Sequence, residues 1–287
     1  MKNETLAQLH MMLIFLIANL TAMLLFPVYT IYEGSLGEEG SNPWMAVYYL
    51  IYIVVITLII VFIAKKGKKN ILRGIFYFAI AWAMWYALFP IFYFFIPPLS
   101  DFLSLGLAII LTVVLIKHPE WYVVNAVGIL VTIGIALIFG MSLSLLPIIL
   151  LLSLFAIYDA IAVHMSKHMV YLADSAIENK LPALFVVPAK EDYSFKRATR
   201  KKVEKEKGER EAYYMGYGDV LIPGILVIAA ERSFGIVSGM FTLIGALVAM
   251  LLLLAMVNSG KPQPGLPYLN AGALAGLLAY LLSQLLL

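Results

Sequence analysis

The chain has 287 residues, of which 63% are hydrophobic and only 13% are charged, and it contains no cysteine. A soluble domain of this length carries about twice that share of charged residues. The composition therefore excludes an ordinary soluble protein and indicates a polytopic membrane protein. Without cysteine, disulfides, a thiol nucleophile and a cysteine-ligated metal are excluded as well.

Nine apolar segments are long enough to cross a bilayer as helices. In chain order they cover residues 7–31, 43–64, 71–96, 98–116, 121–139, 144–166, 212–230, 233–257 and 265–287. The fold class predicted from them is an all-α polytopic membrane protein with nine transmembrane helices. We divide it into helices one to six (1–166), a hydrophilic loop (167–211) and helices seven to nine (212–287).

The basic residues predict the orientation of these helices. With nine spans, 19 of the 20 lysines and arginines fall on one side of the membrane, and only Arg232 falls on the other. Loops rich in lysine and arginine stay in the cytoplasm. We therefore expect a cytoplasmic N-terminus, an external C-terminus and a cytoplasmic 167–211 loop.

The second half of this loop, Lys190 to Arg210, mixes charges of both signs and is predicted to be a solvated or disordered linker. Its first half is more apolar. A surface loop is the favoured interpretation of that half; the alternative is a segment that lies on the membrane or plugs a site.

The seventh segment carries an acid inside an apolar run. Asp219 follows two glycines, Gly216 and Gly218, and precedes Pro223 by four residues. Proline lacks an N–H, so it cannot bond back to the carbonyl of residue 219. A helix with a missing backbone hydrogen bond and a charged side chain is tolerated in a membrane where that part of the helix lines a cavity. We expect Asp219 to line one.

A second acid lies inside the sixth segment. Asp159 is eight residues before Lys167, and Asp219 is nine residues after Arg210. At 1.5 Å per residue, both lie roughly 12–13 Å from the cytoplasmic charges. Two carboxylates that meet cannot both ionise cheaply, so one keeps a proton. Such a pair suits an aspartic protease or a proton- or cation-coupled transporter, and the spacing alone leaves both open.

The residues around the two acids resemble three motifs of one family. Tyr158-Asp159 resembles the YD motif of presenilin and signal peptide peptidase, and Gly216-Tyr217-Gly218-Asp219 resembles their GxGD motif. The family's PAL motif opens the last span, where this chain has Pro264-Gly265-Leu266-Pro267, with glycine in place of the usual alanine. The whole pattern is most similar to a prokaryotic presenilin homologue.

The resemblance implies an intramembrane aspartyl protease that hydrolyses peptide bonds within transmembrane helices, with Asp159 and Asp219 as a catalytic dyad. The other motif residues would position substrate. It implies a bilayer location, here the plasma membrane, with transmembrane substrates as partners and neither metal, cofactor nor nucleic acid. Obligate partner subunits are not indicated, and a homo-oligomer is possible. A transporter using the same acids remains the alternative, and a prepilin-type peptidase, which shares GxGD, ranks below it.

Three further features of the sequence are given no function or only a structural role. Pro182-Ala183-Leu184 spells the PAL motif but lies in the loop before Asp219, so it is assigned no role. Asn125 and Asn258 are expected to form interhelical hydrogen bonds. The glycine pairs 235/239 and 272/276 have the spacing that lets helices approach closely.

Overall fold

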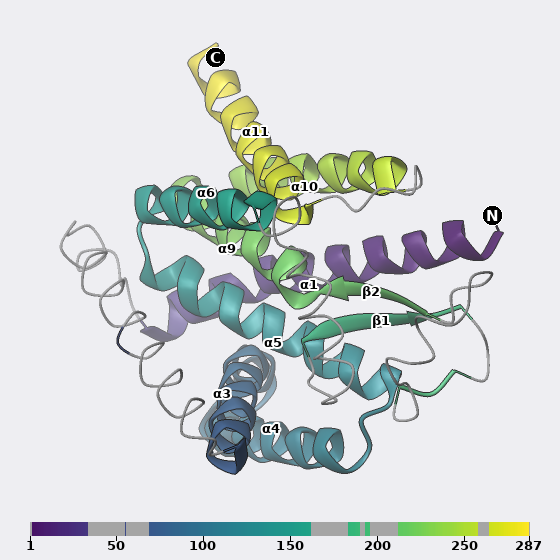
Figure 1. The fold of residues 1–287 in the computed structure, drawn as a ribbon. Helices are drawn as coiled ribbons and strands as arrows, with labels where there is room; N and C mark the ends of the chain where they lie inside the picture. Colours follow the sequence, from purple (N-terminus) through teal and green to yellow (C-terminus); the bar gives the residue numbers. More distant parts are fainter. Residues whose placement is uncertain are drawn as a thin grey trace.

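The computed structural model describes residues 2–33, 55, 69–161, 183–189, 193–195, 212–257 and 264–286. This part of the chain is mostly helical (Figure 1). The helices are α1 (Lys2–Glu33), α3 (Lys69–Phe95), the short 3₁₀ helix η2 (Pro97–Leu99), α4 (Ser100–Lys117), α5 (Trp121–Ser142), α6 (Leu145–Ile161), α9 (Tyr217–Phe234), α10 (Ile236–Val257) and α11 (Gly265–Leu285). The predicted second span, 43–64, lies outside the described residues.

The described helices fit a membrane protein. Six of them (α1, α3, η2 with α4, α5, α10 and α11) contain stretches long and apolar enough to cross a bilayer. Helix α6 is apolar, and 17 of its residues are described. Helix α9 has 18 residues and includes three charged ones. The protein is therefore an integral, multi-pass membrane protein, while the count of nine spans and the orientation of the termini stay predictions.

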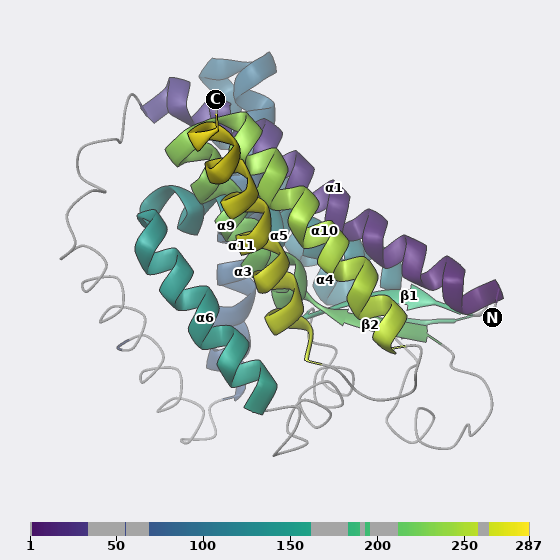
Figure 2. The ribbon, with the colours of Figure 1, turned by 90° about the horizontal axis from the view of Figure 1, so that it is seen from above.

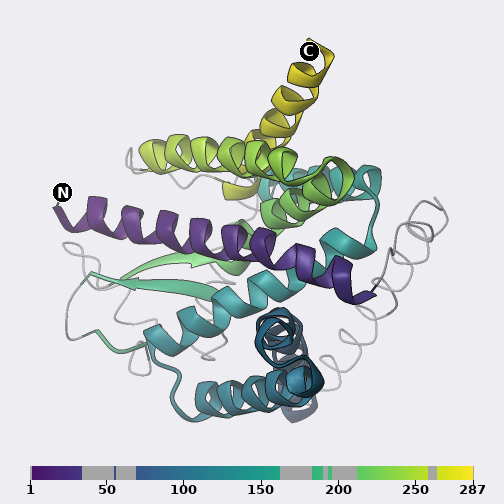
Figure 3. The same ribbon diagram turned by 180° about the vertical axis from the view of Figure 1, so that it is seen from behind.

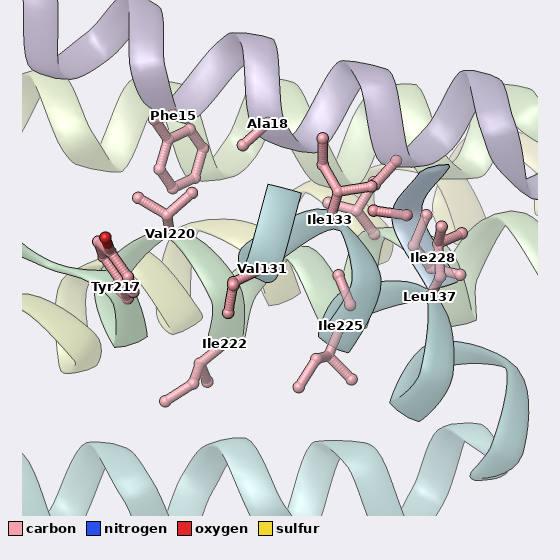
Figure 4. Packing of buried hydrophobic residues seen from close by; sticks show 14 of the residues in the cluster. Phe15, Ala18, Val131, Ile133, Leu137, Tyr217, Val220, Ile222, Ile225 and Ile228 are labelled. Carbon is pink, nitrogen blue, oxygen red and sulfur yellow. The ribbon is translucent and has the colours of Figure 1, made fainter. Parts of the chain in front are cut away.

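Helix α9 is the centre of the molecule. It contacts α1, α5, α6, α10 and α11, and nearly every residue from Val220 to Glu231 is buried. Its side chains Val220, Ile225 and Ile228 lie among those of α1 and α5 (Figure 4). Seen from behind, α1 crosses in front of α5, and α3 and α4 lie below α5 (Figure 3). The helix that carries Asp219 is thus fixed by packing along its length.

The seventh apolar segment is not one continuous helix as expected. Ala212–Gly216 forms strand β2, and helix α9 begins only at Tyr217. Strand β1 (Leu184–Pro188) comes from the hydrophilic loop and pairs with β2 antiparallel, with Leu184 opposite Gly216. The all-α prediction was wrong at this point. Valines and aromatic residues favour extended backbone, and each strand supplies the other with hydrogen-bond partners.

Part of the loop packs against the helices instead of being solvated. The side chains of Phe185 and Phe195 are completely buried. The Ser194 hydroxyl donates to Oε1 of Glu120 at 2.9 Å, before α5. The prediction of a solvated linker from 190 to 210 was therefore wrong for residues 193–195. In the first half of the loop, the described residues 184–188 form β1 and are not a plain surface loop.

Helix α11 is placed by close packing on α10. A Cβ added to Gly272 or Gly276 would collide with backbone atoms of α10, such as the carbonyl oxygens of Gly245 and Phe241. The expected close-packing role of the 272/276 pair is confirmed. Gly235 has another role: its φ of 88° ends α9 in a conformation that favours glycine, and nothing lies within 4 Å of its Cβ position.

Candidate active site

Asp219 lies in the first turn of α9. The helix is preceded by Gly216 as its N-cap, so Asp219 is its third residue. The carboxylate accepts a hydrogen bond from the Gly216 N–H, as the acid of a capping box does. The glycines therefore form a strand-to-helix junction, instead of loosening the middle of a helix as expected. Negative charge is also favoured at a helix N-terminus.

Asp159 lies near the end of α6 and is 1% exposed. Its Oδ2 accepts a hydrogen bond from the N–H of Leu266 at 3.0 Å, and the N–H of Gly265 also bonds to this carboxylate. Its Oδ1 is buried and has no hydrogen-bond partner in the described part of the chain. Gly265 and Leu266 are the first two residues of α11, so Asp159 occupies the N-terminus of another helix.

Gly265 brings the two carboxylates together. Its N–H faces Asp159, whereas a Cβ on it would lie 2.9 Å from Oδ1 of Asp219. The two carboxylates are close enough to interact electrostatically. Figure 2 shows the three helices involved, with α11 and α9 between α6 and α1. Two acids distant in sequence therefore share one site with the start of α11.

The Tyr217 side chain anchors the strand-to-helix junction. Its hydroxyl donates to the carbonyl of Val124 at 2.6 Å, and its ring packs on Phe185 of β1 with centroids 4.5 Å apart. A Cβ on Gly128 would lie 2.5 Å from this ring, so only glycine leaves room for it. Tyr217 thus joins α5, β1 and the start of α9.

Ala183 and Leu184 of the Pro182-Ala183-Leu184 segment, which was assigned no role, are part of this junction, while Pro182 lies outside the described residues. The carbonyl of Ala183 accepts the Tyr217 N–H at 3.0 Å, and Leu184 begins β1. The interpretation as a segment without a role was wrong, because pairing with β2 brings this part of the loop next to the GxGD motif.

The remaining motif residues differ in how closely they approach the two acids. Pro264 is buried before α11, and Pro267 is in its first turn. Gly218 has space beside it, since its Cβ position meets only the Ile222 side chain at 3.8 Å. Tyr158 is 59% exposed on α6 and points away from the buried side of that helix. Within the described residues, no group of three or more histidines or acids could hold a metal ion.

Comparisons with known proteins agree with this geometry. A sequence model described as signal-peptide peptidase, presenilin aspartyl protease matches residues 12–285. The chain belongs to this family. Two solved structures of a presenilin family intramembrane aspartate protease, in space groups C222 and P2, are both 28% identical to it, with TM-scores of 0.65 and 0.66. Each alignment covers 94% of this chain and 96% of the other.

Membership makes the chain an intramembrane aspartyl protease, so the transporter and prepilin peptidase interpretations are set aside. No curated protein sequence matches the chain.

Three asparagines tie the site of this presenilin-family protease to its surroundings. Asn125 bonds to both the N–H and the carbonyl of Val186, so it joins a helix to a strand and not two helices as expected. Asn19 and Asn270 were not singled out from the sequence. Asn19 of α1 donates to the carbonyl of Val220, next to Asp219. For both residues, an asparagine inside an apolar run was the sequence signal that could have indicated an interhelical hydrogen bond. Asn258 lies outside the described residues.

Proposed function

We propose that Asp159 and Asp219 are the catalytic dyad of this protease. The observation that carries the proposal is their shared contact with Gly265: one carboxylate accepts its N–H, and the other lies 2.9 Å from its Cβ position. Two acids at one point inside an apolar fold are energetically costly, and acids in such positions generally serve a function. An acid pair that shares a proton supplies both a general acid and a general base.

In the proposed reaction, the ionised carboxylate takes a proton from a water molecule, and the oxygen of this water attacks the carbonyl carbon of the scissile peptide bond. The protonated carboxylate donates a hydrogen bond to the carbonyl oxygen, which becomes the oxyanion. The same carboxyl group then gives its proton to the leaving nitrogen while the oxyanion re-forms the carbonyl and the C–N bond breaks. The products are a carboxylic acid and an amine, and the dyad again holds one proton. The pair titrates as a unit, so either acid can begin as the base.

A transmembrane helix must unwind before this attack, because its carbonyls are hydrogen-bonded. We infer that the substrate becomes an extended strand near β2 and the Pro264–Pro267 segment. Main-chain hydrogen bonds of the kind made in β-augmentation would hold it there. The β1–β2 pair supports this inference, since it places extended backbone directly before α9.

We also infer nine spans with a cytoplasmic N-terminus, in the plasma membrane, from the distribution of 19 of 20 basic residues. The acids then lie toward the cytoplasmic side, and cleavage falls in the cytoplasmic half of the substrate helix. By analogy with presenilin, the preferred substrates have an external N-terminus. No obligate partner subunit is proposed, and self-association is compatible with the fold.

The test uses the detergent-purified chain with a synthetic transmembrane peptide, and mass spectrometry identifies the products. Cleavage without any ion gradient, lost in Asp159→Ala and in Asp219→Ala, supports the proposal. Normal cleavage by either variant would contradict the dyad. Matched substrates of each orientation in liposomes test the direction of insertion: equal cleavage would contradict the presenilin-like preference but leave the dyad intact.

A further inference from the structure

Helix α6 is held to the rest of the molecule along a narrow stripe. Its buried residues are Ile148, Leu152 and Asp159, while its other side chains are partly or fully exposed. Its main neighbours are α9 and α11, and Figure 2 shows α6 at one side of the bundle. A few contacts therefore determine the height and rotation of the helix that carries Asp159.

One of these contacts is a buried hydrogen bond from α11. The Nδ2 of Asn270, a residue only 2% exposed, donates to the carbonyl of Leu152 at 3.0 Å. Leu152 lies seven residues before Asp159, about 10 Å along α6. Asn270 lies four residues after Leu266, about 6 Å along the same face of α11.

Helices α6 and α11 are thus joined by hydrogen bonds at two heights. One links Asp159 to the N–H of Leu266, and the other links Leu152 to Asn270. A single bond would let α6 pivot about Asp159. A second bond, made by a main-chain carbonyl two turns away, opposes both pivoting and sliding of α6 against α11.

Packing alone does not explain an asparagine at position 270. Within the described residues, its Oδ1 is buried without a hydrogen-bond donor, which is unfavourable. A leucine has the same branching and the same number of side-chain heavy atoms, without a polar atom to satisfy. The benefit of the amide must therefore lie in its donor, which reaches α6.

We propose that Asn270 is a positioning residue that holds α6 in the register at which Asp159 meets the start of α11 and Asp219. This inference rests on the proposed role of Asp159 as a catalytic acid. Asn270 acts through the backbone of α6 and has no contact with the reacting atoms. Its removal therefore changes the rate of the chemical step more than the binding of substrate.

Three variants test the role of the amide. Asn270→Leu keeps the branching of the side chain and removes the donor. Asn270→Ser keeps a polar group that is too short to reach α6 and bonds within its own helix instead. Asn270→Gln keeps an amide donor on a longer side chain. Misplacement of a catalytic group by about 1 Å costs on the order of a hundredfold in rate. We expect kcat with a transmembrane peptide to fall by roughly ten-fold or more in the first two variants, with KM unchanged and partial recovery in Asn270→Gln.

A second measurement reports the position of α6 directly. Because the chain lacks cysteine, spin labels can be attached through cysteines introduced at Leu154 of α6 and Leu278 of α11, both exposed. The distance distribution is expected to broaden in Asn270→Leu. The matched control is Tyr280→Phe, which removes a hydrogen bond from α11 to the carbonyl of Phe234 and is expected to leave both kcat and the distances unchanged.

Wild-type kcat in Asn270→Leu or Asn270→Ser, or an unchanged distance distribution, would overturn the inference. Failure of all three variants to fold would also overturn it, because Asn270 would then be needed for folding and not for position. An active Asp159→Ala enzyme would instead remove the proposed dyad. An inactive Asp159→Ala enzyme beside a fully active Asn270→Leu enzyme would remove only the role of Asn270.

Discussion

Replacing Gly265 by alanine is expected to raise stability and lower activity at the same time. The new Cβ would lie 2.9 Å from Oδ1 of Asp219, whereas ordinary contacts of a Cβ begin at 3.4 Å. The difference, 3.4 − 2.9, requires the carboxylate to retreat by about 0.5 Å. A displacement of about 1 Å costs on the order of a hundredfold in rate, so half of it costs roughly ten-fold.

The stability effect has the opposite sign. Gly265 is the first residue of α11, and its φ is not positive, since Gly235 is the one glycine with positive φ in the described chain. Alanine at such a position stabilises a protein by about 0.4–1 kcal/mol, mainly by restricting the unfolded chain. The backbone conformation of residue 265 thus suits the family's usual alanine, although the alanine Cβ would displace the Asp219 carboxylate.

The assay compares peptide cleavage and thermal unfolding of Gly265→Ala, Gly265→Val and the control Gly106→Ala. Gly106 lies in α4 with nothing within 4 Å of its Cβ position, so its replacement should raise stability without changing kcat. Valine adds two methyl groups beside Asp219 and is expected to reduce kcat by more than about a hundredfold. A fully active Gly265→Val enzyme would refute the placement of Gly265 between the two acids.

Other predictions follow from contacts of the same region. Asp159→Ala and Asp219→Ala should each abolish peptide cleavage, with the double variant no worse, because the pair acts as one unit; additive losses would contradict this. Gly224→Ala places a Cβ 2.1 Å from Oδ1 of Asn19 and should destabilise the protein by about 1–3 kcal/mol in thermal unfolding. Addition of Asn19→Ala should recover part of that loss of stability. If the stability changes of the two single variants simply add in the double variant, the predicted clash is contradicted. Asn125→Leu should speed amide hydrogen exchange in β1, and unchanged protection would show that the amide does not hold the strand.

The helices and the two acids could be predicted from the sequence because each leaves a local signal. Apolar runs predicted every described α-helix of the bundle, with starts that differ by a few residues; α9 begins at Tyr217 instead of near Ala212. Asp159 and Asp219 stood out because an acid within such a run is costly. Their meeting followed from equal depth, but the part played by Gly265 needed the structure.

The β1–β2 pair could not be predicted because its cause is not local. Hydropathy treats Ala212 to Ala230 as uniform, although the chain changes from strand to helix at Gly216. Whether Tyr213 and Tyr214 are extended depends on Val186 and Val187, more than 25 residues earlier in the chain, which pair with them. Long-range pairing of this kind overrides the local apolar pattern.

The burial of individual polar residues also could not be predicted from their positions along a transmembrane segment. Glu231 lies one residue beyond the predicted span 212–230, yet it is buried, and its Oε2 has no partner among the described residues. Its Cβ lies 3.0 Å from the Cβ position of Gly239. Asn270 looked like one polar residue in an apolar helix. Its importance depends on α6 lying against it, and the crossing of two helices is set by the packing of the whole bundle.

Both acids are held by helix N-termini, and this arrangement explains the residues of the PAL-like element. The first turn of any helix has N–H groups without partners inside the helix. In α11 the first two, from Gly265 and Leu266, bond to Asp159, and the third position is Pro267, which has no N–H to satisfy. In α9 the N-cap N–H bonds to Asp219 itself.

The two helix starts therefore provide main-chain hydrogen-bond donors to the two carboxylates. No lysine or arginine is among the hydrogen-bond partners described for either acid. A cationic partner would hold an acid permanently ionised, whereas main-chain donors leave the pair able to exchange the proton that hydrolysis requires.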